Sequence, residues 1–561
     1  MGEPIDWEAE RRSFAGIPGS GFNLAWEAVE ARARDVHASD SALLLAGSEG
    51  GVRAVSFGEL AREVRRCAAA LRQLGLRKGD TVFLALERSL ELYACFFGAL
   101  ECGAIVAPLH ASYGPEAVRS RLALGRARIL VTGAAAARRL RPVLASLPGL
   151  AYVIAVEEPD EPAPPGTLGY GGLLARAPAE FAIERTREED PALLHFTSGT
   201  VGLPRGTLHV HGVALAQRLS ARVALDLRPG DVFWGTPDPG WGLGTACALV
   251  GPLLAGATSV VEPREFEASR AYRLVAEQRV SVWLLTLAEL RLLVRAGEEA
   301  ARAHDLSALR LVACTGEWLP PEFVRWGERA FGLPIHDLWG QTETGTVLIA
   351  NVPALPVRPG SMGKPLPGVE ACLVRRELGG GVAVLAAGEG EGELALRGGM
   401  PALFRAYLDP ERREAKGFVD DLYLTGDLVR RDADGYHWFI GRAADAIRCA
   451  GRLVGPVEVE RVLGEHPAVA EVAVIGLPDP ELGERVKAFV ALRPGGQPSE
   501  SLRAELLAFG GCRLPEAVAP RELEFRPLLP RTRNGMLLRR VLRTREPGLE
   551  AAEPSELEEP A

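Results

Sequence analysis

The first half of the chain alternates short strand patterns with amphipathic helix patterns. Apolar residues at helical spacing predict a helix over 57–74, and Gly75 supplies a common end signal. Strand patterns at 80–86 and 129–132 enclose a second helical stretch at 90–102. The alternation continues with strands at 152–156, 280–285 and 309–314 and a helix at 287–295. This pattern is typical of βαβ units and predicts an α/β fold with parallel and mixed sheets.

A change in character near residue 440 predicts a domain boundary. The turn sequence Arg-Asp-Ala-Asp-Gly at 431–435 precedes a compact α+β pattern. Its helices are expected at 456–463 and 502–509, and its strands at 470–475 and 486–492. We therefore expect a large N-terminal domain of several subdomains over 1–440 and a small mobile domain over 441–545.

Three segments stand out by composition. Residues 157–191 are rich in proline and acidic side chains, which predicts an excursion over the surface. Residues 546–561 contain six glutamates and no apolar period, which predicts a disordered acidic tail. Residues 239–261 carry no charge and are long enough to span a bilayer. Their five glycines and two prolines favour a loop, helix and turn buried in an α/β core.

The overall composition excludes several classes of protein. A net charge of -9 gives no general attraction to nucleic acid or to anionic membranes. Eight cysteines without a C-x-x-C pair indicate a reducing cytosol rather than a disulfide scaffold or zinc ribbon. Residues 1–12 lack the basic and apolar regions of a signal peptide. We expect a cytoplasmic protein with no nucleic-acid partner and no integral membrane association.

The segment His-Phe-Thr-Ser-Gly-Thr-Val-Gly-Leu-Pro-Arg-Gly at 195–206 has the chemistry of a phosphate-binding loop. Glycines let backbone N–H groups close around an anion, and hydroxyls add further donors. These residues are Thr197, Ser198, Thr200, Gly199, Gly202 and Gly206, with Arg205 adding a positive charge. The segment lacks the G-x-x-x-x-G-K-[ST] pattern of a Walker A loop. Alone, it fits a polar surface turn equally well.

Four further segments follow in order: Trp339-Gly-Gln-Thr-Glu-Thr-Gly345, Leu424-Thr-Gly-Asp427, Gly441-Arg442 and Leu529-Pro-Arg-Thr-Arg-Asn-Gly535. With the phosphate loop they resemble the AMP-forming acyl-CoA synthetase family, over about residues 40–545. Asp238-Pro-Gly-Trp241 and the segments 358–370 and 454–460 look most like the acetyl-CoA synthetase branch. The resemblance implies that a carboxylic acid reacts with ATP to form an acyl-adenylate, which coenzyme A then converts to a thioester. It also implies Mg²⁺.

The resemblance carries roles over to matching residues. Thr197 to Gly206 would hold the β- and γ-phosphates, Thr342 the α-phosphate and Glu343 the magnesium ion. Asp427 would bind the ribose hydroxyls and Arg442 would reach the ribose or a phosphate, although Asp427 alone also fits a turn-capping aspartate. Two short segments would flank the adenine: Gly316, Glu317 and Trp318, and Asp337, Leu338 and Trp339. Gly340 and Gln341 would complete the nucleotide contacts.

Two further features concern the acid and the histidines. Trp241 fits either the acyl pocket or a plain core. Gly340 stands where the acetate branch usually has a second tryptophan, and this exchange predicts an open cavity and an acid longer than acetate. His209 and His211 form H-x-H, but no third ligand lies nearby, which favours core or edge histidines over a metal site.

The C-terminal motifs depart from the family pattern. Met536 occupies the position of the usual catalytic lysine, and a thioether cannot bridge two anions. Ala444 stands at the hinge position, and Leu453 stands where an arginine is usual. The sequence therefore leaves two functions open: an acyl-CoA synthetase, or a catalytically impaired adenylate-binding relative with a regulatory or sensor role. The expected partners are a small carboxylic acid and a nucleotide, and a homodimer is compatible with the sequence.

Overall fold

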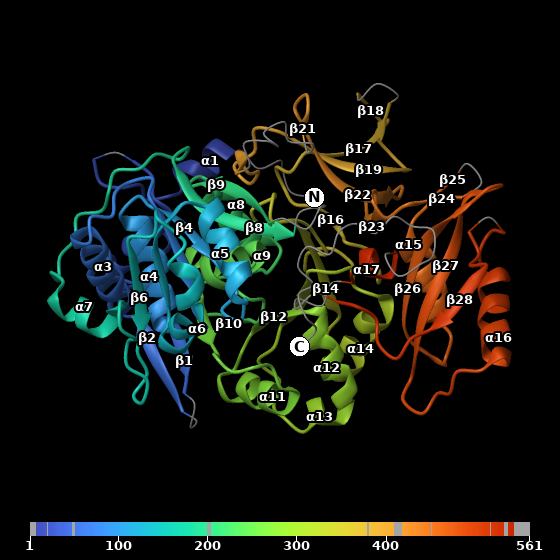
Figure 1. The fold of residues 1–561 in the computed structure, drawn as a ribbon, viewed down its shortest axis with the longest axis horizontal. Helices are drawn as coiled ribbons and strands as arrows, with labels where there is room; N and C mark the ends of the chain where they lie inside the picture. The colour runs from blue at the N-terminus through green and yellow to red at the C-terminus, as the bar shows by residue number, and fades with distance from the viewer. Residues whose placement is uncertain are drawn as a thin grey trace.

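The computed structural model describes residues 7–19, 21–47, 51–198, 204–377, 381–408, 418–449, 452–516, 518–531 and 537–543. Their strands form sheets of nine, eight, six and five strands. Figure 1 shows the five-stranded sheet with its helices, coloured orange to red, beside the larger body formed by the preceding residues. The α/β class, with a large N-terminal region and a smaller C-terminal domain, is confirmed.

One of the two large sheets contains eight strands. In spatial order they are β20 (Ala406–Leu408), β9 (Pro204–Val210), β8 (Pro191–Ser198), β4 (Ile105–Pro108), β3 (Thr81–Ala85), β5 (Ala127–Gly133), β6 (Tyr152–Val156) and β7 (Leu168–Gly169). The strands from β8 to β7 run parallel to one another. Strands β9 and β20 are antiparallel and form one edge. The predicted strand positions at 80–86, 129–132 and 152–156 are confirmed.

The second large sheet contains nine strands. In spatial order they are β16 (Lys364–Pro365), β15 (Val347–Ala350), β14 (Ile335–Gly340), β13 (Leu311–Thr315), β12 (Val282–Thr286), β10 (Val232–Gly235), β11 (Thr258–Val261), β1 (Ser41–Ala46) and β2 (Val52–Ser56). The central strands from β14 to β1 are parallel, and both edges are antiparallel. Buried parallel strands need helices on both faces, as the sequence alternation predicts.

Helices cover both faces of these sheets. The helices are α1 (Trp7–Arg12), η1 (Trp26–Glu30), α2 (Ala31–Ala33), α3 (Phe57–Gln73), α4 (Leu90–Glu101), α5 (Pro115–Leu124), α6 (Ala134–Leu144), α7 (Tyr170–Arg176), α8 (Val213–Val223), α9 (Gly242–Gly244), η2 (Thr245–Val250), α10 (Gly251–Ala255), α11 (Ala268–Glu277), α12 (Leu287–Ala296), α13 (Glu298–Arg302) and α14 (Pro321–Phe331). Val82 and Leu84 of β3 enter a core with α3 and α4, whereas Phe83 enters another with α5 and α6. Successive side chains of β3 therefore pack against helices on opposite faces of the sheet.

Local sequence explains where helix α3 begins and ends. Ser56 accepts a hydrogen bond from the amide of Glu59, and the Glu59 side chain accepts one from the Ser56 amide, which forms a capping box. After the helix, Gly75 adopts a φ of 78°, a left-handed conformation that glycine tolerates. The helix expected over 57–74 is therefore confirmed.

The predicted surface excursion over 157–191 is only partly exposed. Strand β7 pairs with β6 at the sheet edge, and α7 follows it. Tyr170, Leu173 and Leu174 contribute apolar side chains to the core beside α3. Their i, i+3, i+4 spacing supplies a helical core face that the proline- and acid-rich composition conceals.

The uncharged segment 239–261 is buried, as predicted. It forms α9, η2, α10 and β11, and their apolar side chains pack between the large sheets. Within the described part of the chain, no helix combines the length and apolar character needed to cross a bilayer.

A six-stranded antiparallel sheet precedes the C-terminal domain. Its strands are β18 (Val382–Val384), β17 (Ala371–Arg376), β19 (Gly390–Arg397), β22 (Leu422–Arg431), β21 (Phe418–Val419) and β23 (His437–Arg442), the last of which pairs with β22.

The five-stranded sheet contains β25 (Arg452–Val454), β24 (Ile447–Cys449), β27 (Gly483–Leu492), β26 (Val469–Asp479) and β28 (Glu522–Phe525). Its helices are α15 (Pro456–Gly464), α16 (Glu500–Gly511) and α17 (Arg539–Arg543).

The C-terminal elements match their predicted positions, with a longer central ladder. Strands β26 and β27 pair from Val469 opposite Leu492 to Asp479 opposite Gly483. Gly483 has a φ of 80°, which suits the turn that closes this ladder. The predicted acidic tail at 546–561 lies outside the described residues.

Candidate functional site

The predicted nucleotide-binding segments meet around the turn that follows β14. His209 of β9 contacts the carbonyl of Thr342, Trp339 of β14 contacts Asp427 of β22, and Tyr407 of β20 contacts Glu343. The three contacts join segments from two large sheets and the six-stranded sheet. Residues that are far apart in the sequence therefore form one site.

Asp427 is the centre of a buried polar network. The residue is 1% exposed, and Oδ2 accepts hydrogen bonds from Trp339 Nε1 at 2.9 Å and Gln341 Nε2 at 3.0 Å. Gln341 also donates to the carbonyl of Thr425 and accepts a 2.7 Å hydrogen bond from the Tyr423 hydroxyl. These contacts fix the orientation of the carboxyl group.

The second oxygen of Asp427 faces Arg442. Arg442, directly across the β22–β23 pair, places Nη1 2.9 Å from Oδ1. No hydrogen-bond donor among the described residues is aligned with this buried oxygen. Burial raises the pKa of Asp427, while Arg442 and the donors from Trp339 and Gln341 act in the opposite direction. An oriented acceptor with a cation beside it suits a hydroxyl-bearing ligand such as a ribose.

Backbone contacts hold the turn at 341–345 in place. His209 Nε2 donates to the Thr342 carbonyl at 2.7 Å, because a carbonyl can only accept. Gln217 donates to the Gly345 carbonyl at 3.1 Å, and the amide of Phe404 donates to the Glu343 carbonyl at 2.9 Å. Burial lowers the pKa of His209 to about 4, so this imidazole is neutral at pH 7. Thr342 and Glu343 are thus presented by a rigid turn.

Both predicted histidines are core residues. His209 is 1% exposed, and His211 is fully buried with Nδ1 accepting from the amide of Leu24. The described residues contain no group of three or more candidate metal-ligating side chains. The prediction of core or edge histidines is confirmed, but the contact between His209 and Thr342 is not evident from sequence.

Glu343 suits a magnesium ion that is shared with a nucleotide. Its Oε1 accepts a 3.0 Å hydrogen bond from the Tyr407 hydroxyl, whereas no donor among the described residues is assigned to Oε2. Mg²⁺ prefers oxygen ligands and usually combines one or two carboxylates with substrate phosphates and waters. A single half-buried carboxylate with one uncommitted oxygen fits that pattern.

The predicted adenine-flanking residues lie at the ends of β13 and β14. Gly316 has a φ of 105°, and a Cβ there would come within 3.1 Å of the Trp241 ring. Glycine therefore permits a close approach of the indole. Trp318 Nε1 donates to the Gly360 carbonyl at 3.0 Å.

Asp337 carries a buried carboxyl group at this end of the sheet. It is 4% exposed, and Leu338 of the same strand is also buried. Burial raises the Asp337 pKa to about 8, against the effect of backbone donors at Leu319 and Leu338. Its Oδ2 has no partner among the described residues. A protonated carboxyl group is therefore the main form at neutral pH.

Glu317 links the N-terminal region to the C-terminal domain. Its Oε2 lies 3.3 Å from Arg291 and 3.4 Å from Arg531, and Arg531 also lies 3.3 Å from Glu471 of β26. Arg531 forms a β-bridge with Leu537, on the far side of the last predicted motif. Through Arg531, the described part of the C-terminal motif thus lies beside Glu317.

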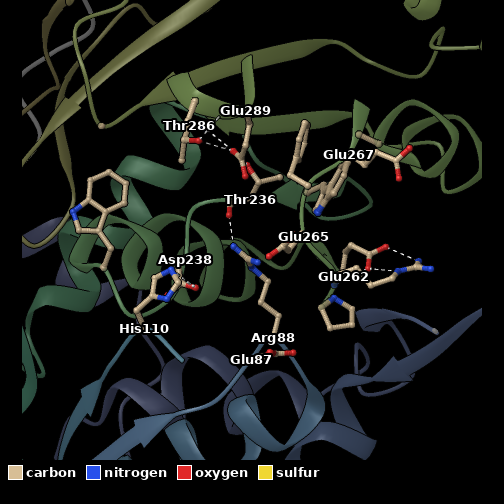
Figure 2. A pocket seen from close by; sticks show the side chains of 18 of the residues that line it. Glu87, Arg88, His110, Thr236, Asp238, Glu262, Glu265, Glu267, Thr286 and Glu289 are labelled. Atoms are coloured by element: carbon tan, nitrogen blue, oxygen red, sulfur yellow. Dashed lines mark hydrogen bonds and ion pairs between the residues drawn. The ribbon is translucent and has the colours of Figure 1, made fainter. Parts of the chain in front are cut away.

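A cavity of about 350 Å³ opens at the carboxyl ends of strands from both large sheets. Trp241, Thr315, Gly316 and Glu317 form part of its lining, which joins it to the predicted nucleotide segments. Figure 2 shows Arg88 between the two sides of this cavity, where its guanidinium donates to the Thr236 carbonyl. Crevices at these strand ends are common ligand sites in α/β proteins.

Backbone and side-chain atoms fill the space beside the Cα of Gly340, which does not fit the open cavity predicted there. A Cβ on Gly340 would lie 2.5 Å from the Thr346 carbonyl oxygen and 3.0 Å from Leu243 Cδ2. Strand β15 approaches β14 closely at an irregular register beside Gly340, and the fully buried Leu243 fills the remaining space. The expected preference for acids longer than acetate depended on open space beside Gly340, so Gly340 no longer supports it.

Several predicted residues cannot be placed. Gly199, Thr200, Gly202 and Met536 lie outside the described residues, and the side chains of Ser198 and Leu453 are likewise outside them. Thr197 and Arg205 face each other across the β8–β9 hairpin, and Gly206 packs against Leu194 and Leu408. Ala444 lies in the exposed turn between β23 and β24.

Sequence reasoning missed two tyrosines of the site. Tyr423 and Asp427 lie four residues apart on β22, and such spacing places side chains on one face of a strand. That periodicity could have associated Tyr423 with the predicted ribose site. Tyr407 has no comparable signal, because its contact with Glu343 depends on β20 joining β9 from a distant part of the chain.

Comparison with known proteins identifies the family of this fold and site. Residues 29–408 match the AMP-binding enzyme family, and residues 458–536 match the AMP-binding enzyme C-terminal domain. An acetyl-coenzyme A synthetase of Bacillus subtilis (strain 168) is 38% identical over 559 residues, covering 99% of this chain and 96% of that protein. The chain therefore belongs to the AMP-binding enzyme family, among AMP-forming acyl- and acetyl-CoA synthetases.

Solved structures agree with this assignment. An acyl-CoA synthetase of Brucella canis is 33% identical with a TM-score of 0.74, covering 96% of this chain and 97% of that one. An anthranilate CoA ligase in complex with anthranoyl-AMP is 28% identical with a TM-score of 0.84, covering 96% and 98%.

Proposed function

We propose that the protein is an AMP-forming acyl-CoA synthetase that activates a carboxylic acid with ATP and transfers the acyl group to coenzyme A. The main support is the Asp427 network, in which donors from Trp339 and Gln341 fix a buried carboxyl group and Arg442 lies 2.9 Å from its Oδ1. Membership of the family leads us to expect acyl-adenylate chemistry. That chemistry requires a group that binds the ribose of the adenylate, and the Asp427 carboxyl group can serve as that group.

In this proposal, the turn at 341–345 serves the first half-reaction. The acid carboxylate attacks the α-phosphorus, the bond to pyrophosphate breaks, and Thr342 contacts the α-phosphate. Glu343 would hold Mg²⁺, which would offset negative charge on the phosphates when bound. His209, Gln217 and Phe404 keep the turn fixed, so little reorganisation accompanies the developing charge.

The second half-reaction requires the thiol to reach the acyl carbonyl. The thiol loses its proton to water, its sulfur attacks that carbon, and the carbon–oxygen bond to the phosphate breaks, so that AMP departs with that oxygen. We propose that the cavity beside Trp241 and Gly316 admits the thiol to the site. Its lining contains many charged and polar side chains, which suits an elongated ligand with amide groups better than a purely aliphatic one.

The identity of the acid depends on the residue that closes the acyl pocket. An acid longer than acetate was expected because of Gly340, but Leu243 and the Thr346 carbonyl occupy the adjacent space. We therefore propose that Leu243, rather than residue 340, sets the pocket length. This favours a short-chain acid.

A second candidate function follows from Met536. An uncharged thioether at the usual lysine position favours a relative that binds adenylates but forms them slowly. Such a protein would act as an adenylate sensor. Ala444 and Leu453 point in the same direction, because both replace side chains that the family uses in its C-terminal domain.

ATP–pyrophosphate exchange with acetate, propionate, butyrate, hexanoate and benzoate tests both functions. A synthetase should show exchange that depends on one of these acids, and Asp427→Ala should abolish most of it. If the wild type exchanges slowly, Met536→Lys should raise the rate at least about tenfold, because one preorganised electrostatic partner contributes roughly 10²- to 10³-fold. Failure of the wild type to bind AMP or ATP in calorimetry would rule out both functions.

Three further expectations accompany this function as proposals. The domain boundary near 440 would lie between β23, which ends at Arg442, and β24, which begins at Ile447. A cytoplasmic location is compatible with eight free cysteines. Gel filtration with light scattering would test whether the protein forms the homodimer with which its sequence is compatible.

A further inference from the structure

Tyr407 connects the proposed metal-binding carboxylate to the phosphate-loop hairpin. It lies on β20, directly opposite Thr207 of β9, and it is 8% exposed. Its hydroxyl donates to Glu343 Oε1 at 3.0 Å. The hydrogen bond occupies one carboxylate oxygen and restricts rotation of the group.

Arg205 fixes the other side of this tyrosine. Its guanidinium carbon lies 4.6 Å from the centre of the Tyr407 ring, within the range of a cation–π contact. Arg205, Tyr407 and Glu343 therefore form a continuous chain of contacts from the hairpin to the turn.

We propose that Tyr407 is a positioning residue that holds Glu343 with Oε2 directed toward a nucleotide-bound divalent cation. This inference rests on the proposed nucleotide-binding function. A carboxylate that is free to rotate would lose conformational entropy when it binds the cation. The hydrogen bond from Tyr407 restricts that rotation before the cation binds, so less entropy is lost. Tyr407 would therefore affect Mg·ATP far more than a nucleotide that binds without metal.

The structure supplies a matched tyrosine on the ribose side. Tyr423 is 3% exposed, and its hydroxyl donates to Gln341 Oε1 at 2.7 Å, while Gln341 donates to Asp427. Both tyrosines thus orient a side chain of the same turn through one hydroxyl. Because Gln341 leads to the ribose carboxylate, removal of the Tyr423 hydroxyl should weaken AMP and Mg·ATP together.

Equilibrium calorimetry without a carboxylic acid measures binding with no turnover. Tyr407→Phe keeps the ring and its contact with Arg205 but removes the hydroxyl. We expect its affinity for Mg·ATP to fall about tenfold, at the lower end of the range for residues that orient metal ligands. Its affinity for AMP in metal-free buffer should stay within about twofold of wild type. Tyr423→Phe should weaken both ligands by similar factors.

A double-variant cycle tests whether Tyr407 acts through Glu343. In a Glu343→Gln background, Tyr407→Phe should produce no further loss of Mg·ATP affinity. Unchanged Mg·ATP binding by Tyr407→Phe, an equal loss of AMP binding, or a full additional loss in the Glu343→Gln background would each overturn the inference. Failure of the wild type to bind either nucleotide would instead refute the proposed function.

Discussion

At the scale of single residues, the buried carboxyl group of Asp337 makes stability depend on pH. Its pKa is raised from 3.8 to about 8, so the folded chain retains a proton that the unfolded chain releases above pH 4. The stabilisation is present in full below the unfolded pKa and is lost as pH rises toward 8. The loss has a slope of about 1.4 kcal/mol per pH unit.

Asp337→Asn should remove this dependence. We expect the thermal midpoint of the wild type, relative to the variant, to fall steadily from pH 5 to about pH 8 and to level off above it, where Asp337 is ionised in both the folded and the unfolded chain. Asp432 is a suitable control, because hydrogen bonds from Trp438 and Tyr436 and the charge of Arg358 outweigh partial burial and lower its pKa. Asp432→Asn should give a pH-independent difference in this window. An equally flat difference for Asp337→Asn would show that Asp337 is already ionised.

Leu243 should determine the length of the acid. It is fully buried, and its Cδ2 occupies the space beside Gly340. Leu243→Ala should shift the ratio of exchange rates from acetate toward butyrate and hexanoate, since each added buried methylene contributes about 0.8 kcal/mol. The same change should cost about 2–5 kcal/mol of stability because it leaves a cavity. An unaltered acid preference in a folded variant would assign pocket length to another residue.

At the scale of elements, Gly340 keeps β14 and β15 together. A Cβ at this position would meet the Thr346 carbonyl at 2.5 Å, and a backbone group cannot rotate away. Gly340→Ala should therefore lower stability by about 1–3 kcal/mol, as overpacking usually does. It should also displace the turn that carries Thr342 and reduce nucleotide affinity.

Gly172 provides the matched control for this substitution. It lies in α7, and a Cβ there would meet nothing within 4 Å. Gly172→Ala should leave nucleotide binding unchanged and stabilise the chain by up to about 1 kcal/mol through helix propensity. Thermal unfolding and AMP calorimetry on both variants would check this pair. Normal AMP affinity in Gly340→Ala would mean that β15 shifts without moving the turn.

The sequence predicted regular elements well because their signals are local. Helix α3 has an apolar period and a terminal glycine, and β26 has a continuous apolar run, so both were located from spacing alone. Helix α7 was missed because its three core-facing side chains lie within a polar segment. The ends of elements are harder to predict from the sequence. The β26–β27 ladder, for example, continues through residues whose pairing depends on the partner strand.

The candidate site was predictable only where resemblance supplied it. Spacing gives no reason for Trp339 to donate to Asp427 or for Tyr407 to donate to Glu343, because strands from separate sheets create these contacts. Glycine is ambiguous for a similar reason. Gly340 fits an open pocket or a close backbone approach equally well from sequence, and only the position of Thr346 decides between them.

At the scale of the whole molecule, Arg531 joins the C-terminal domain to the nucleotide segments. It lies between Glu317 of the N-terminal region and Glu471 of β26, with both side-chain distances near the outer limit of a close ion pair. The partly exposed geometry suggests a modest contribution, about 1 kcal/mol, which corresponds to about a fivefold change in the docking equilibrium. Arg531 therefore biases the domain arrangement without locking it.

Arg531→Ala should make the turn between β23 and β24 more accessible. We expect limited proteolysis at residues 443–446 to accelerate about fivefold, because cleavage follows the population of the undocked form when reclosing is fast. Arg485→Ala is the matched control, since Arg485 pairs with Glu522 at 2.7 Å inside the C-terminal domain and should leave this rate unchanged. If Arg531→Ala is cleaved at the wild-type rate, the contact with Glu317 does not hold the domains together. If both variants accelerate equally, loss of stability within the C-terminal domain explains the effect, and the domain arrangement must be set by other contacts.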